Sequence, residues 1–183
     1  VGGWKNGQTS ALLGGVVVTT NATSGSDVGS TYLTAAAGGT LSGAASGNYA
    51  ITYIDGLLRV TPRSLTVSAA DQSRIYGDAN PALSWSVGGM GLVNGDALTG
   101  ALTTNAGLAS NVGDYGIVQG SLAASANYDL TFNPGLLRVT PPALTVTASD
   151  ASMIYGNALP DLGYSVGGWK NGQTSALLGG VVV

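Results

Sequence analysis

The sequence predicts an all-β chain in which small β-sandwich units follow one another in tandem. Three observations lead to this prediction. Apolar residues alternate with a period of two, turn residues recur about every 8–12 positions, and long stretches of sequence repeat. No stretch shows the apolar stripe of an amphipathic helix. A β-grasp-like sheet with one short helix near residues 96–102 is the alternative, because periodicity does not separate the two topologies.

The longest repeat is exact. Residues 1–18 return unchanged as residues 166–183, so the same sequence recurs after 165 positions. Such a chain is typical of a segment taken from a tandem array, and an array needs only that each unit stack on its neighbour. The first function to consider is therefore a structural one.

A second, divergent repeat lies within this period. Residues 58–62 (Leu-Arg-Val-Thr-Pro) recur as residues 137–141, and Ile75-Tyr76-Gly77 recurs as Ile154-Tyr155-Gly156, in each case 79 positions later. Measured across the 165-residue period, the alternate spacing is 86. We therefore expect three segments: residues 1–62 as the C-terminal part of one repeat, residues 63–141 as a complete repeat, and residues 142–183 as the N-terminal part of the next.

The expected strands follow from local alternation. Leu65, Val67 and Ala69 share one face, and residues 83–87 alternate in the same way. Tyr128, Leu130 and Phe132 share a face, as do their counterparts in residues 49–53. Residues 57–60 alternate, and the β-branched run of residues 16–18 predicts a strand buried on both faces. Six or seven short strands of this kind fit an Ig-like sandwich.

Turns and linkers are equally explicit. Asn6-Gly7, Asn94-Gly95 and Asn171-Gly172 predict tight turns, because Asn and Gly tolerate positive φ. Each repeat ends in Val-Thr-Pro and the next begins at once, which leaves a short, stiff linker. We expect units joined in this way to form a semi-rigid stalk.

Composition excludes several functions. Charged residues make up 8% of the chain, the net charge is −3, and the sequence has no Cys, His or Glu. Disulfides, thiolate or imidazole metal sites and a histidine base are thus excluded, and we expect no enzyme. Six scattered basic residues predict no nucleic-acid partner, and the longest nearly apolar run, residues 11–18, is too short to insert into a membrane.

The remaining candidate sites favour structural roles. Asp71 and Asp78 could form a carboxylate pair, but Asn157 replaces the second Asp in the sister repeat, so we expect residues that cap local backbone. No cofactor is expected, because no Asp-x-Asp-x-Asp-Gly loop exists; calcium at a junction between units stays open. Lys5 and Lys170 occupy one repeat position, matching Gly91 or a gap, and we expect them on a solvated face.

The aromatic residues point to a second function. Trp4, its copy Trp169 and the repeat tyrosines could stack on a carbohydrate, which makes a carbohydrate- or protein-binding adhesive module the alternative to a stalk. For Tyr76 and Tyr155 we favour a structural role, in which the tyrosine anchors a loop and the following glycine adopts a conformation barred to other residues. The expected structural motif comprises Tyr49, Pro62, Tyr76, Gly77, Pro81, Tyr128, Pro141, Tyr155, Gly156 and Pro160.

The order of these motifs resembles a known family. Ile75 to Leu83, Val87 to Asp96, Val112 to Tyr115, Asn127 to Phe132 and Gly135 to Pro141 are together similar to the mostly-bacterial, glycine-rich (MBG) repeat of the Tyr-Gly-x type. The resemblance implies tandem repeats of large secreted or surface-exposed bacterial proteins, including filamentous-haemagglutinin-like adhesins, and no catalytic residues. It implies a spacer or the body of an extracellular fibre.

The expected partners are neighbouring repeats of the same chain or fibre. Residues 142–183 of one copy could complete the sandwich begun by residues 1–62 of another, by strand addition.

Overall fold

The computed structural model describes residues 2–44 and 46–178 and contains strands, turns and three single-turn 3₁₀ helices. The helices are η1 (Ser10–Leu12), η2 (Ser46–Asn48) and η3 (Ser175–Leu177). The prediction of an all-β fold is confirmed. The β-grasp-like alternative is wrong, because residues 96–102 contain an isolated β-bridge at Thr99 and a bend at Gly100 but no helix.

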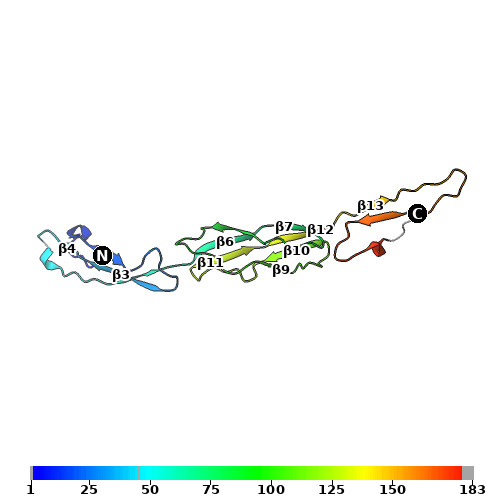
Figure 1. Ribbon diagram of the computed structural model, residues 1–183. Coiled ribbons are helices and arrows are strands. Elements are labelled where there is room, and N and C mark those ends of the chain that lie inside the picture. The colour runs from blue at the N-terminus through cyan, green and yellow to red at the C-terminus, as the bar shows by residue number, and fades with distance from the viewer. Residues whose placement is uncertain (1, 45, 179–183) are drawn as a thin grey trace. The chain divides into compact units, whose positions relative to one another are not determined.

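Residues 63–141 form a sandwich of two sheets (Figure 1). The first sheet has the order β11-β6-β8, with β11 at Tyr128–Asn133, β6 at Arg63–Ala69 and β8 at Trp85–Gly89. The second has the order β7-β12-β10-β9, with β7 at Gln72–Ile75, β12 at Gly135–Thr140, β10 at Gly113–Val118 and β9 at Thr103–Thr104. The chain therefore changes sheets between β6 and β7.

The last strand of the sandwich pairs differently on its two edges. β12 runs antiparallel to β10, with Tyr115 opposite Leu137. On its other edge β12 runs parallel to β7, with Leu137 opposite Gln72 and Thr140 opposite Ile75. A parallel pair between the start and the end of one repeat requires the rest of the repeat as its connection.

The core lies between the two sheets and follows the predicted alternation. Its fully buried side chains come from β6, β10, β12 and one connecting loop: Leu65, Val67, Ile117, Leu122, Leu137 and Val139. In β12 the residues between them, Leu136 and Arg138, are exposed. Burial of apolar surface from both sheets is the main stabilising contribution here. All the buried residues among those described lie between positions 65 and 139.

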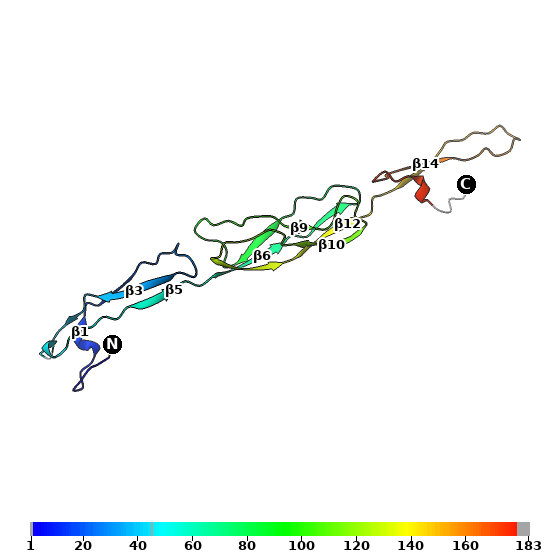
Figure 2. The ribbon, with the colours of Figure 1, turned by 90° about the horizontal axis from the view of Figure 1, so that it is seen from below.

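Residues 2–62 carry a three-stranded sheet and a separate strand pair. The sheet has the order β2-β3-β5, with β2 at Val17–Thr20, β3 at Thr31–Ala37 and β5 at Gly56–Arg59 (Figure 2). Tyr32 lies opposite Leu58, which repeats the pairing of Tyr115 with Leu137. The strand pair joins β1 (Leu13–Gly14) to β4 (Thr40–Leu41).

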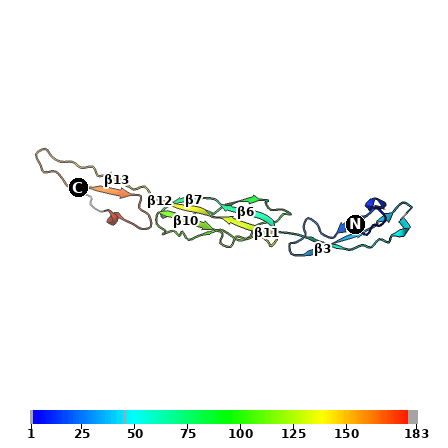
Figure 3. The same cartoon turned by 180° about the vertical axis from the view of Figure 1, so that it is seen from behind.

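Residues 142–178 carry one further pair of strands. β13 (Thr145–Ala148), labelled in Figure 3, runs antiparallel to β14 (Tyr164–Gly167), with Val146 opposite Val166. This pairing copies that of β6 with β8, in which Val67 lies opposite Val87.

Residues that are buried in the complete repeat are exposed in its sisters. Leu65 is 0% exposed and its counterpart Leu144 is 42% exposed; Leu137 is 0% exposed and its counterpart Leu58 is 39% exposed. Each half-repeat thus presents an apolar face that the other half covers in the complete repeat. The predicted strand at residues 16–18 follows the same rule: β2 begins at Val17, but Val17 and Val18 are 58% and 65% exposed, so the expectation of burial on both faces is wrong.

The chain divides into two compact units. The first comprises Val1–Ser64, Leu92–Ala97 and Ala124–Asp129; the second comprises Leu65–Gly91, Leu98–Ala123 and Leu130–Val183. Two loops of the complete repeat therefore belong with the preceding repeat, and most of its sandwich belongs with the following one.

The sister leucines give a test within one chain. We expect Leu137→Ala to destabilise the sandwich by about 2–5 kcal/mol, because it leaves a cavity in a packed core. We expect Leu58→Ala to cost about 1 kcal/mol or less in dilute solution, because its side chain is already partly in water. Urea unfolding followed by the NMR signals of β10 and β12 measures both values. Equal losses would contradict the assignment of the core.

Candidate functional site at the ends of the repeats

A tyrosine hydroxyl holds an Asn-Gly turn in both kinds of repeat. In the complete repeat the Tyr128 hydroxyl accepts a hydrogen bond from the Val93 N–H at 3.0 Å and donates to Asp96 Oδ2 at 2.7 Å. The turn between them is tight, with φ of 57° at Asn94 and 80° at Gly95. The predicted turn at Asn94-Gly95 is therefore present, and Tyr128 fixes it to the end of β11.

The sister repeat uses the same arrangement. The Tyr49 hydroxyl accepts a hydrogen bond from the Lys5 N–H at 3.0 Å and donates to Gln8 Oε1. Asn6 and Gly7 adopt φ of 52° and 72°. Because Lys5 and Val93 make the same backbone contact, the structure aligns the repeat lysine with Val93. The two-residue gap in the lysine repeat accordingly falls before this position, and Gly91 is not the counterpart of the lysine.

The Tyr-Gly motif forms a turn after β7. The Tyr76 N–H donates to the Thr140 carbonyl at 2.8 Å, and the Asp78 N–H donates to the Ile75 carbonyl at 3.1 Å. Gly77 has φ of +86°, a conformation that disfavours any side chain. In the sister repeat Gly156 has φ of +92°, and the Tyr155 side chain is fully exposed.

Lys170 reaches this turn from the following repeat. Its ammonium group lies 2.7 Å from Asp78 Oδ1. Lys5 is exposed, as expected for a solvated face, whereas Lys170 is half-buried, with 37% of its side chain exposed, and forms an ion pair that the sequence did not predict. A cavity of about 260 Å³ adjoins the contact, and its lining includes Tyr76, Leu144 and Trp169.

A different set of contacts connects the complete repeat with the preceding one, within the first compact unit. Asn127 donates from Nδ2 to Asp27 Oδ1 and accepts at Oδ1 from the Val28 N–H, both at 2.8 Å. Asn94 donates from Nδ2 to the Ser24 carbonyl at 3.1 Å. The loop at residues 24–28 is thus hydrogen-bonded to the two loops that surround Tyr128.

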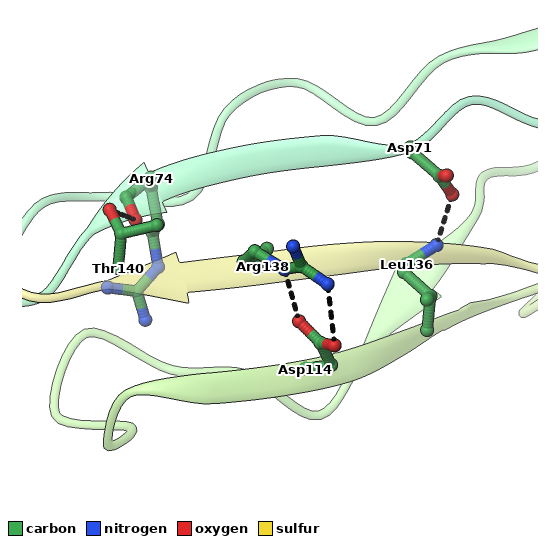
Figure 4. Close-up of polar contacts among 6 residues, drawn as sticks. All are labelled: Asp71, Arg74, Asp114, Leu136, Arg138 and Thr140. Atoms are coloured by element: carbon green, nitrogen blue, oxygen red, sulfur yellow. Dashed lines mark hydrogen bonds and ion pairs between the residues drawn. The ribbon is translucent and has the colours of Figure 1, made fainter.

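The two candidate carboxylates, Asp71 and Asp78, bind groups that are distant in the sequence and do not cap neighbouring backbone. Asp71 Oδ1 accepts from the Leu136 N–H at 2.8 Å, which ties the bend between β6 and β7 to β12 (Figure 4). Asp78 pairs with Lys170. The expectation of caps on neighbouring backbone is therefore wrong for both side chains, because their partners lie 65 and 92 positions away.

A bidentate ion pair crosses the exposed face of the second sheet. Arg138 Nε and Nη2 lie 2.8 Å and 3.0 Å from the two carboxylate oxygens of Asp114 (Figure 4). The hydrogen bonds from Arg138 lower the pKa of Asp114 below its ordinary value of 3.8. In the sister sheet Thr31 lies opposite Arg59, so this ion pair belongs to the complete repeat.

Arg74 is a buried charged residue that the sequence pattern did not single out. It is 6% exposed, and its guanidinium donates to Asn80 Oδ1 at 2.7 Å and to the carbonyls of Ile75 and Gly107. Asn80 in turn donates to the Ala106 carbonyl at 2.6 Å. The sister positions hold Met153 and Leu159, so a polar pair in one repeat replaces an apolar pair in the other. That paired exchange was visible in the sequence.

The remaining motif residues lie at the edges of the repeats. Pro62 and Pro141 are exposed at the linkers, whereas Pro81 and Pro160 are half-buried after the Tyr-Gly turns. Trp4 is half-buried, and its ring meets Tyr49 edge to face at 5.2 Å between centroids. Both aromatic residues are thus engaged in packing within the repeat.

Within residues 2–44 and 46–178, no three acidic side chains approach closely enough to hold a metal ion. No helix in the same residues is long and apolar enough to cross a membrane.

Comparison with known families agrees with these shared turns. The model of the MBG domain (YGX type) matches three times, at residues 1–59, 65–138 and 144–182. The chain belongs to the MBG domain family of the YGX type. The Tyr-Gly turns at Tyr76 and Tyr155 lie within the second and third MBG matches. No curated protein and no solved structure matches the chain.

The exchange at Arg74 predicts coupled mutational effects in the MBG repeat. We expect Arg74→Met alone to cost about 1–3 kcal/mol, because Asn80 and the Gly107 carbonyl lose a buried donor. The double variant with Asn80→Leu reproduces the sister pair and should recover part of that loss. Urea unfolding of the two single variants and the double variant gives the coupling. Strictly additive losses would show that the pair does not act together.

The Asp114–Arg138 pair predicts a pH dependence. Because the folded-state pKa of Asp114 is lowered, its contribution is present above the ordinary value of 3.8 and is lost as the pH falls through the lower folded value. We expect Asp114→Asn to reduce stability at neutral pH and to have a diminishing effect as the pH drops below that value. Thermal unfolding between neutral and strongly acidic pH measures this, with Asp129→Asn as the control on an exposed residue of β11. A difference that persists unchanged in acid would refute the assignment.

Proposed function

We propose that this MBG segment is a structural repeat in the stalk or fibre of an extracellular bacterial adhesin or filament, displayed at the cell surface. Membership in the MBG family supports a place among the repeats of bacterial surface proteins. The segment acts mechanically: it sets the distance between whatever the array carries and the surface to which it is attached.

One observation carries this proposal: the polar groups that both kinds of repeat retain support the backbone. Tyr128 and Tyr49 both hold an Asn-Gly turn through the same two hydrogen bonds. The groups that could do chemistry differ between the repeats, since Asn157 replaces Asp78 and Met153 replaces Arg74. A shared framework with variable charges suits a spacer and not a catalyst, and we propose that the segment is not an enzyme and needs no cofactor.

Direct contacts between successive repeats give further support. The linker around Thr61 and Pro62 lies in the first compact unit beside the loop that Asn127 holds by two hydrogen bonds. The Arg63 N–H also donates to the Asn127 carbonyl at 2.9 Å. A linker that is short, contains proline and is flanked by hydrogen bonds restricts bending between repeats.

We propose that the open half-repeats are completed by a second copy of this sequence. The partner is the adjacent repeat of the same chain or fibre. Residues 142–183 supply the pair β13 and β14, and residues 1–62 supply the sheet β2-β3-β5. Joined as in the complete repeat, they would cover Leu58, Leu144 and Val146, whose counterparts Leu137, Leu65 and Val67 are 0% exposed.

The alternative, an adhesive module that binds carbohydrate or protein, draws no support from Trp4 and Tyr49. Trp4 packs against Tyr49, and the Tyr49 hydroxyl is already engaged by the Asn6-Gly7 turn. A stacking platform needs an aromatic face open to the ligand.

Polypeptides of one, two and three 165-residue periods test the stalk. We expect the maximum dimension from small-angle scattering to rise in proportion to the number of periods, because the linkers restrict bending. We also expect the 183-residue chain to associate with increasing concentration in sedimentation, since each end presents half a sandwich. A dimension that grows only as for a compact globule would overturn the stalk. A strictly monomeric chain would overturn completion by a separate copy.

A further inference from the structure

The Tyr76-Gly77-Asp78 turn, here the receiving turn, accepts a lysine from the repeat that follows. Lys170 Nζ lies 2.7 Å from Asp78 Oδ1, and the two side chains are 37% and 44% exposed. The lysine backbone is itself fixed, because the Lys170 carbonyl accepts the Gln173 N–H at 3.0 Å across the Asn171-Gly172 turn. The Lys170 ammonium group is therefore held in place by a hydrogen-bonded turn and does not lie on a free chain end.

Gly77 makes room for this lysine. A Cβ atom at Gly77 would lie 2.6 Å from Lys170 Cβ, closer than real Cβ contacts allow, and 3.2 Å from its Cγ. Gly156, the matched glycine of the sister repeat, has a similar left-handed φ of +92°. The absence of a side chain at Gly77 thus serves the approach of Lys170 in addition to the turn itself.

The two charges change together between the two kinds of repeat. The sister of Asp78 is Asn157, and the residue that the tyrosine hydroxyl aligns with the lysine is Val93. In the alternating array, a repeat like residues 63–141 followed by the lysine-bearing kind brings Asp against Lys. The reverse order brings Asn against Val. The neutral pair and the charged pair therefore occupy alternate junctions.

We propose that the receiving turn is a selective docking surface for the lysine-bearing repeat, and that the Asp78–Lys170 pair fixes which kind of repeat follows. Two repeats of the 63–141 kind in succession would place Asp78 against Val93. Two of the lysine kind would place the lysine against Asn157. Each wrong order leaves one charge without its partner, which is how a charge pattern discriminates between similar surfaces.

The ion pair can discriminate between the two kinds of neighbouring repeat, but it contributes little to the stability of the fold. Exposed pairs of this type contribute little to overall stability and are screened by salt. The adjoining cavity is lined by apolar side chains, including Trp169 and Leu144, which supply contact area between the two repeats. The ion pair then fixes how the repeats are oriented at this contact. The Asp78–Lys170 contact forms within the chain itself and does not depend on where the array is located.

Spin labels test the junction in the full chain. The sequence has no cysteine, so Ser86→Cys and Ser165→Cys place labels at equivalent exposed positions of β8 and β14. We expect a single narrow distance distribution in the otherwise unchanged chain. Asp78→Asn, which copies the sister residue, and Lys170→Met should each lose that narrow maximum. Salt at about 1 M should produce the same loss, because it reduces the screening length to about 3 Å.

The charge-reversed double variant, Asp78→Lys with Lys170→Asp, should restore the narrow maximum. Asp114→Asn is the matched control, since it removes an ion pair whose carboxylate, at 42% exposed, is as accessible as that of Asp78, at 44%, and should leave the distribution unchanged. The proposal is overturned if the distribution is broad before any substitution, if Asp78→Asn and Lys170→Met leave it narrow, or if the reversed pair stays as broad as the single variants.

Discussion

The burial of one sheet face against the other is the constraint on which the rest of this chain depends. Leu65 and Val67 come from the start of the repeat, and Leu137 and Val139 come from its end, so the core forms only when both ends are present. The same residue types at Leu144, Val146 and Leu58 are exposed because each lies in half a repeat. Local strand pairing survives in those halves, whereas apolar burial does not.

A second layer of organisation lies at the ends of the sandwich. The tyrosines at positions 128 and 49 fix turns that are defined by Asn and Gly, and turns of this kind carry the residues that meet the preceding repeat. Val93 and the lysine position share one backbone geometry but differ in charge. The repeat therefore separates its constant part, which is hydrogen-bonded backbone, from its variable part, which is side-chain chemistry at the junction.

Much of this was predictable from the sequence, because period-two alternation and repeated motifs report local structure and burial directly. The strands at residues 65–69 and 128–132, the Asn-Gly turns and the all-β class followed from such patterns, whereas residues 49–53 show the same alternation but form no strand. The burial predicted for Val17 and Val18 did not hold, because a β-branched run identifies a strand but not what covers it. The partners of Asp71, Asp78 and Lys170 were missed because they lie 65 or 92 positions apart. Arg74 and Asn80 could have been found by comparing the sister repeats.

The parallel pairing of β7 with β12 has a consequence for an array under tension. These strands lie near the two ends of the same repeat and run in the same direction, with four residues of each in register. Force applied through the linkers would load their hydrogen bonds in shear, so several bonds would have to break together instead of one after another. The carboxylate of Asp71 adds one more bond across the same seam. Resistance to pulling would then be set by a short stretch of backbone, almost independently of the surface chemistry of the repeat.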